Sequence, residues 1–134
     1  CAVDETVFDN FLQDTNRGKT WGDIIKRFVS LQMLGGENSR ALIRHLLTQM
    51  SNMPEPNSEA LRFGLELLKA RDMRSSLAEI DIPIQMILGE CDALMPNTLA
   101  REMSKLNPAI QVESFATAAH APFLSHPARF AAMI

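Results

Sequence analysis

The chain has 134 residues, of which 46% are hydrophobic, and this length is enough to bury one hydrophobic core. A formal net charge of -3 gives no indication of binding to nucleic acid or to a membrane surface. No apolar run approaches the roughly 20 residues that span a bilayer, and no signal-peptide pattern is found.

Four helices are expected in residues 1–76. Val7, Phe8, Phe11 and Leu12 recur with the helical period and indicate the first helix. Thr20 is expected to cap the second helix, which Gly35 and Gly36 end; the third begins at Asn38 or Ser39, and the fourth at Ser58. The apolar stripes are Trp21, Ile24, Ile25, Phe28 and Leu31 in the second helix, Leu42, Ile43, Leu46, Leu47 and Met50 in the third, and Leu61, Leu65 and Leu68 in the fourth.

The pattern changes after residue 76. Residues 84–88 form a short apolar run that ends at Gly89, which is typical of a strand buried on both faces. A helix from about Pro96, a second strand over residues 110–115 and a last helix over residues 127–134 are expected to follow. This βαβ order predicts two parallel strands, which leave both outer edges of the sheet unpaired. The fold class is therefore α/β, and the sheet is expected to be completed by other residues or by a partner.

Two polar residues follow the two predicted strands. Asp92 lies just after the first strand, and His120 lies 28 residues later, just after the second. Parallel strands place their ligands and catalytic groups at their C-terminal ends, and an acid followed by a histidine is the chain order of α/β-hydrolases. Taken alone, such an aspartate is usually a turn residue and such a histidine a solvated surface group. In this order and on consecutive strands, the pair predicts the acid and base of a catalytic triad.

The other candidate residues have simpler explanations. His45 is expected on a helix surface, and His126 is expected to have a local structural role before Pro127. Cys91 is interpreted as a small buried hydrophobe. Together Cys1 and Cys91 lack metal-ligand spacing and are too few for a disulfide framework, which favours reduced thiols in a cytoplasmic protein.

A nucleophile is not found in these residues. No Gly-x-Ser-x-Gly turn occurs, and the nearest approach is the Gly18–Gly22 segment around Thr20. The turn requires a preceding strand, whereas Thr20 is better explained as a helix cap. We therefore expect the chain by itself to be inactive.

Four segments resemble the pimeloyl-[acyl-carrier protein] methyl ester esterase (BioH) family of biotin synthesis. These segments are Phe28 to Gly35, Gly64 to Leu68, Asp72 to Arg74 and, above all, Ala118 to Pro127. The resemblance implies that residues 1–76 are a helical cap and that residues 77–134 are the C-terminal βαβα part of an α/β-hydrolase core. The N-terminal strands, the nucleophilic serine and the oxyanion hole would then lie in an N-terminal half that is not part of this chain.

The resemblance also implies a reaction. It is hydrolysis of the methyl ester of a pimeloyl chain carried on acyl carrier protein, with His120 as base and Asp92 orienting it. No cofactor and no metal is implied, and neither nucleic acid nor a membrane is expected as a partner.

Basic residues gather in the region of the cap. Between residues 17 and 44 there are six basic and two acidic side chains, a balance of +4. Arg27, Arg40 and Arg44 match family positions that contact the acidic carrier protein, whereas Asp23 stands where the family has a further arginine. A solvated helix face is the simpler explanation of the same charges.

Two other functions remain open. The chain is either part of a general α/β-hydrolase carboxylesterase acting on other small esters, or a non-catalytic module that binds acyl carrier protein.

Overall fold

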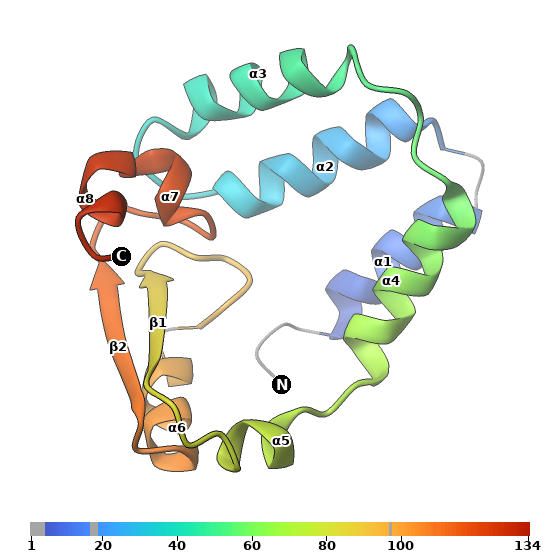
Figure 1. Cartoon of the computed structure of the whole chain (residues 1–134). Coiled ribbons are helices and arrows are strands. Elements are labelled where there is room, and N and C mark those ends of the chain that lie inside the picture. Colours follow the sequence, from blue (N-terminus) through green and yellow to red (C-terminus); the bar gives the residue numbers. More distant parts are fainter. Residues whose placement is uncertain (1–4, 17–18, 97) are drawn as a thin grey trace.

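The structure is a computed structural model that describes residues 5–16, 19–96 and 98–134. Its elements lie in a ring, with the first four helices on one side and the strands on the other (Figure 1). In chain order they are α1 (Glu5–Asn16), α2 (Trp21–Met33), α3 (Ser39–Met50), α4 (Ser58–Ala70), α5 (Arg74–Ala78), β1 (Ile84–Gly89), α6 (Thr98–Leu106), β2 (Ile110–Phe115), α7 (Pro122–Ser125) and α8 (Pro127–Ala131). Cys1 and Arg17 lie outside the described residues.

The predicted Thr20 cap of α2 is confirmed, whereas Asn38, at the start of α3, makes no side-chain cap hydrogen bond. Thr20 accepts a hydrogen bond from the Asp23 amide at 3.3 Å, and its hydroxyl donates to the Asp23 carboxylate at 2.7 Å. Helix α4 begins at Ser58, as predicted, and its cap is Asn57, whose side chain accepts from the Ala60 amide at 2.9 Å. Gly35 follows the end of α2 with φ +84°, a conformation that favours glycine.

The core of the helical segment joins three helices. Phe11 of α1, Ile24 of α2 and Leu65 of α4 are buried together, and partly buried Val7, Leu12, Trp21 and Leu31 pack around them. The buried face of α2 differs from the expected stripe, since Val29 and Met33 are buried whereas Phe28 is exposed. Near the C-terminal end of α2, the Gln32 carbonyl accepts a hydrogen bond at 3.0 Å from the His120 amide, in the loop after β2.

An acidic side chain is buried where α1 and α2 meet. Asp14 pairs with Lys19 at 2.8 Å and with Arg27 at 2.5 Å, and the Arg27 guanidinium also lies over the Phe11 ring. The hydrogen bond from Lys19, aided by the one from Arg27, holds the pKa of Asp14 below its ordinary value of 3.8. The ion pairs therefore stabilise the fold above that pH, and their contribution is lost as the pH falls through the lower, folded-state pKa.

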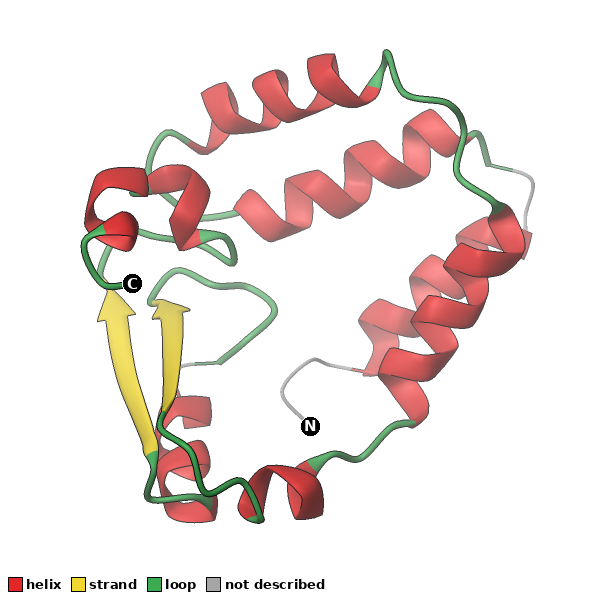
Figure 2. Cartoon of the chain, viewed as in Figure 1, coloured by secondary structure: helices red, strands yellow, loops and turns green. Residues whose placement is uncertain are grey.

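The two strands pair in parallel, as expected, with Ile84 opposite Ile110 and Gly89 opposite Phe115. Among the described residues β1 has no other partner, so its outer edge is open (Figure 2). The expectation that β1 is buried on both faces is wrong for this chain, in which only Gly89 of that strand is fully buried. Among the described residues, nothing pairs with the outer edge of β1, and this leaves most of its side chains partly exposed.

The C-terminal helices are shorter than expected. The last one ends at Ala131 instead of residue 134, and the separate turn α7 precedes it. Pro127 cannot continue a helix from His126, which separates the two. The short helix α5 was not predicted; Asp72 binds both the backbone amide and the guanidinium of Arg74 at its start, and these hydrogen bonds hold the pKa of Asp72 well below its usual range.

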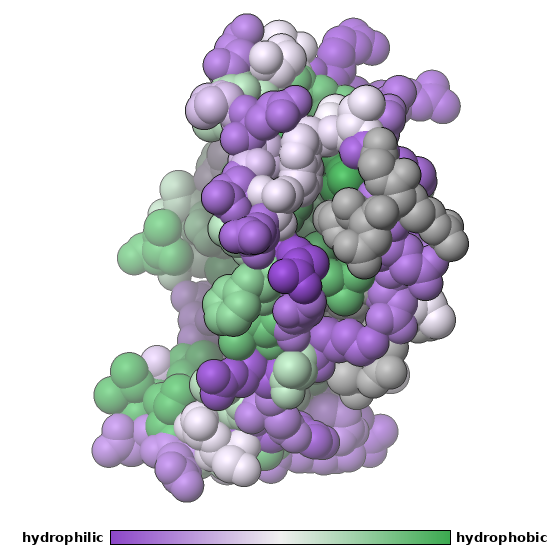
Figure 3. Space-filling view, turned by 90° about the vertical axis from the view of Figure 1, so that its right-hand side faces the viewer, coloured by the Kyte–Doolittle hydropathy of each residue, from purple (hydrophilic) through white to green (hydrophobic). Residues whose placement is uncertain are grey.

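The side of the molecule that carries α1 and α4 presents apolar patches among hydrophilic side chains (Figure 3). Phe63, Leu67 and Leu68 of α4 are exposed, so Leu68 of the expected apolar stripe does not join the core. None of the described helices is long and apolar enough to cross a membrane.

Substitution of the central core phenylalanine tests this packing. Phe11→Ala is expected to lower the free energy of unfolding by about 3 kcal/mol, because the side chain is only 3% exposed and its removal leaves a cavity. The matched control Phe63→Ala removes the same atoms from a side chain that is 66% exposed, and should change that free energy by less than about 0.5 kcal/mol. Equal losses in urea denaturation would contradict the described core.

Candidate active site

The sheet brings the predicted acid and histidine together. Because Gly89 and Phe115 are paired in the register, the loops that follow them start side by side. Asp92 lies in the first loop and His120 in the second, and His120 Nδ1 is 2.8 Å from Asp92 Oδ2. The two side chains are thus in hydrogen-bond contact.

The two oxygens of Asp92 have separate partners. Oδ1 accepts hydrogen bonds from the backbone amides of Leu94 at 2.7 Å and Met95 at 3.1 Å. These bonds fix the turn and leave Oδ2 for the histidine. The Asp92 side chain is only 3% exposed, so its hydrogen bond to His120 is shielded from water.

The carboxylate also determines the tautomer of His120. An ionised carboxylate only accepts hydrogen bonds, so Nδ1 must carry the proton in this contact. Nε2 of the neutral ring is then an acceptor, and it has no partner among the residues that the structure describes. The side chain is 29% exposed, and Nδ1 faces Asp92, so Nε2 is the ring nitrogen left for a reacting hydroxyl group.

Gly89 is required by a close backbone approach. A Cβ atom on Gly89 would lie 2.1 Å from the Ala119 carbonyl oxygen and 2.4 Å from that of Ala118. The sequence marks Gly89 only as the end of a strand and gives no signal of this close approach. The neighbouring Cys91 amide donates to the Ala118 carbonyl at 2.9 Å, which joins the two loops directly.

Cys91 is not the fully buried side chain that was expected. It is partly exposed, and its thiol donates to the Ala116 carbonyl at 3.5 Å. The described residues contain no group of three or more His, Cys, Asp or Glu side chains arranged to hold a metal ion.

His126 belongs to a chain of hydrogen bonds that reaches a distant part of the sequence. Its Nδ1 is 2.8 Å from the Ser125 hydroxyl, and its Nε2 is 3.0 Å from the Thr117 hydroxyl. Thr117 in turn donates to Glu37 at 2.9 Å, 80 residues away in the sequence. The predicted structural role agrees with this placement, but Glu37 as a partner gave no sequence signal.

The three candidate arginines lie in two different environments. Arg40 and Arg44 are exposed on α3, and neither has an ion-pair partner among the described residues. Arg27 is committed to Asp14, although 44% of its side chain remains exposed. Asp23 is explained by its contact with Thr20 at the start of α2.

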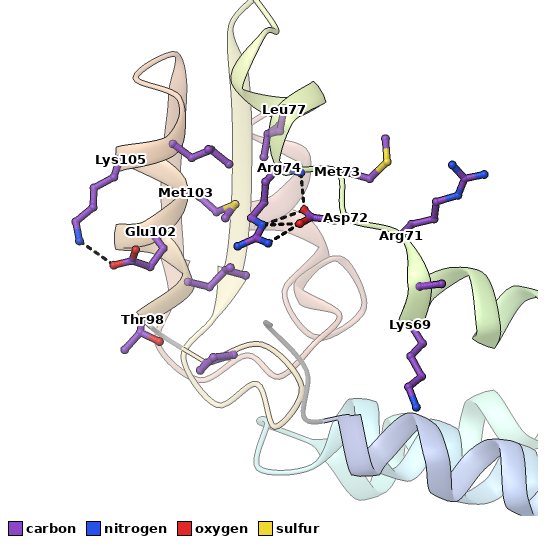
Figure 4. A pocket seen from close by; sticks show the side chains of 14 residues that line it. Lys69, Arg71, Asp72, Met73, Arg74, Leu77, Thr98, Glu102, Met103 and Lys105 are labelled. Atoms are coloured by element: carbon purple, nitrogen blue, oxygen red, sulfur yellow. Dashed lines mark hydrogen bonds and ion pairs between the residues drawn. The ribbon is translucent and has the colours of Figure 1, made fainter.

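A cleft of about 870 Å³ lies elsewhere, between the α4–α5 connection and α6 (Figure 4). Neither Asp92 nor His120 lines it. Both acidic side chains that line the cleft form ion pairs, Asp72 with Arg74 and Glu102 with Lys105. We therefore assign the candidate chemistry to the strand-end loops and not to this cleft.

Solved structures with the same arrangement identify the fold. An esterase from Exiguobacterium antarcticum superposes on 96% of the chain with a TM-score of 0.78 at 19% sequence identity, and the chain covers 46% of it. A bromoperoxidase from Bacillus anthracis superposes on 98% with a TM-score of 0.79 at 14% identity, and the chain covers 48% of it. The chain therefore has the fold of part of an α/β-hydrolase. This fold corresponds to about half of each of these proteins.

Curated relatives refine the comparison, although no protein-family model matches the chain. It is similar to proteins named pimeloyl-[acyl-carrier protein] methyl ester esterase. The identity is 41% over 110 residues in Serratia marcescens, 36% over 129 residues in Photobacterium profundum and 36% over 126 residues in Methylococcus capsulatus. These alignments cover 82%, 96% and 94% of this chain. The chain spans about half the length of these relatives, covering 43%, 50% and 47% of them.

The assigned tautomer can be tested with Asp92→Asn. The amide oxygen should still accept from the Leu94 and Met95 amides, so these should stay protected from hydrogen exchange. The amide nitrogen then donates to His120 Nδ1, and the ring is expected to move its proton to Nε2. Nitrogen-15 NMR of the imidazole measures this change; an unchanged tautomer would show that Asp92 does not control it. Asp81→Asn, at an exposed site, is the control.

Proposed function

We propose that this chain supplies the acid and the base of a serine-type carboxylic ester hydrolase. The observation that carries the proposal is the 2.8 Å contact between His120 Nδ1 and Asp92 Oδ2 at the ends of two parallel strands. The accessible Nε2 atom supports it, because a general base must reach the proton that it removes. The esterase names of the curated relatives agree with this reaction.

The proposed mechanism assigns one task to each group. Nε2 of His120 takes the proton of a serine hydroxyl as the oxygen attacks the ester carbonyl, and the protonated ring then gives this proton to the departing alcohol. In the second half of the reaction, the same nitrogen activates water to hydrolyse the acyl-enzyme. Asp92 keeps the ring in the required tautomer and stabilises its positive charge.

The nucleophile is proposed to lie outside these residues, on a segment that pairs with the open edge of β1. That edge adjoins the strand whose end carries Asp92, so an added parallel strand would end beside the candidate site. We further propose that residues 1–76 form the cap over this site and that residues 77–134 form part of the core. The relatives' greater length supports this arrangement.

The proposed substrate is a pimeloyl methyl ester carried on acyl carrier protein. The protein is proposed to act in the cytoplasm. The relatives' names support the ester, and the basic side chains of the cap support the acidic carrier. Arg40 and Arg44 lie four residues apart, on one face of α3, and their charges are not shared with an acidic neighbour among the described residues. Arg27 joins this patch with a smaller expected effect because Asp14 already pairs with it.

The catalytic assignment is tested in the complete protein, meaning this chain together with the segment that carries the nucleophile. His120→Ala and Asp92→Asn are each expected to lower kcat for a p-nitrophenyl ester by about 10⁴-fold, because both belong to one proton-transfer unit. The control His45→Ala, at an exposed site on α3, should retain full activity. Undiminished turnover by the His120 variant would refute the proposed mechanism.

The carrier contact is tested with the double substitution Arg40→Glu and Arg44→Glu. We expect KM for the carrier-bound methyl ester to rise at least about tenfold at low salt, since two attractive contacts become repulsive. The KM for a free methyl ester should not change. The control Arg101→Glu, on α6, reverses one charge outside this patch. An equal effect on both substrates would favour a general carboxylesterase.

A further inference from the structure

The loop that carries His120 passes between two glycines from opposite parts of the fold. Gly89, at the end of β1, approaches Ala118 and Ala119 from the sheet. Gly36, in the turn between α2 and α3, approaches the same loop from the helical segment, where an added Cβ would lie 2.9 Å from both N and Cβ of Ala119. Distances this short require a shift of the loop, so only glycine allows the observed approach at either side.

Backbone hydrogen bonds attach the loop to both sides. The Glu37 amide donates to the Thr117 carbonyl at 2.7 Å, and the His120 amide donates to the Gln32 carbonyl at 3.0 Å. Between these two contacts, the Ala118 carbonyl accepts from the Cys91 amide of the Asp92 loop. The end of α2 and the turn after it therefore hold the backbone of His120 itself.

A chain of side-chain hydrogen bonds strengthens this attachment. The carboxylate of Glu37 accepts from the Thr117 hydroxyl, so the Thr117 oxygen is left to accept from His126 Nε2. In the neutral ring, Nδ1 then accepts from the Ser125 hydroxyl at 2.8 Å. His126 also packs edge-on against Phe115, the last residue of β2. The side chain of Glu37 is thus linked through Thr117 and His126 to Phe115, at the C-terminal end of β2.

We propose that the turn formed by Gly35, Gly36 and Glu37 positions the His120 imidazole for its reaction with the nucleophile. The proposal rests on the proposed function, in which His120 is the base. Gly36 permits the close approach, and Glu37, together with Thr117, fixes the loop in register. These are positioning residues, because none of them touches the reacting atoms.

One consequence concerns the helical segment. Its corner at the α2–α3 turn is fixed to the catalytic loop by contacts with Thr117, Ala119 and His120. Displacement of that corner would displace the base as well.

The first experiment compares two glycine substitutions in the complete protein. Gly36→Ala is expected to lower kcat for a small ester by about 10- to 100-fold with little change in KM, because a displacement of the base near 1 Å costs this much. The low-field proton NMR signal of His120 Nδ1–H should shift at the same time. Gly64→Ala is the control, since nothing lies within 4 Å of the added Cβ on α4. If both variants had the same kcat and the same signal, the proposal would be wrong.

The second experiment removes only the hydroxyl of Thr117. Thr117→Val keeps the shape of the side chain and is expected to lower kcat by about three- to tenfold. Thr117→Ser should restore most of that loss because it keeps the donor to Glu37. A merely structural role would lower the urea midpoint of the valine variant but leave its kcat and the His120 signal unchanged, and that result would overturn the proposal.

The outcomes also separate the two proposals. If His120→Ala were fully active, the proposed function would fail. If His120→Ala were inactive while the Gly36 and Thr117 variants matched the control, only the positioning role would fail.

Discussion

Parallel pairing of β1 with β2 determines where the polar side chains Asp92 and His120 meet. Parallel strands end at the same edge, so the loop after each strand begins next to the other. With Gly89 opposite Phe115, the third residue after β1 and the fifth after β2 meet in a hydrogen bond. A shift of the register by one residue would separate them and also turn the strand's side chains to the other face. The α6 crossover makes this parallel arrangement possible.

The buried carboxylates of the fold illustrate two uses of the same group. Asp14 gives both oxygens to basic side chains and joins α1 to α2 through ion pairs. Asp92 instead gives one oxygen to backbone amides and keeps the other for a neutral ring. In the first arrangement, the carboxylate charge is paired with two basic side chains and stabilises the contact between two helices. The second keeps the charge directed at a group that can become positive, which is the electrostatic condition for a base that gains a proton during a reaction.

Much of this architecture could be predicted from local patterns. The four long helices, the two strands, the Thr20 cap and the Asp92–His120 pair depend on periodicity, capping and chain order, which neighbouring residues determine. The exposed positions of Phe28 and Leu68 could not be predicted, because tertiary contacts decide which flank of an amphipathic helix is covered. The same holds for Gly36 against Ala119 and Glu37 against Thr117, whose partners lie about 80 residues away and leave no periodic trace.

The long separation between Glu37 and Thr117 has a consequence for the order of folding. Helices α1 to α4 form from local contacts, whereas the bonds from Gln32 and Glu37 to the loop after β2 close a segment of about 80 residues. Closing a loop of this length costs conformational entropy before any contact repays it. The histidine loop should therefore acquire its final shape only after both the helices and the strand pair have formed. Formation of the Asp92–His120 contact is then a late event, and it reports that the described part of the chain has reached its native topology.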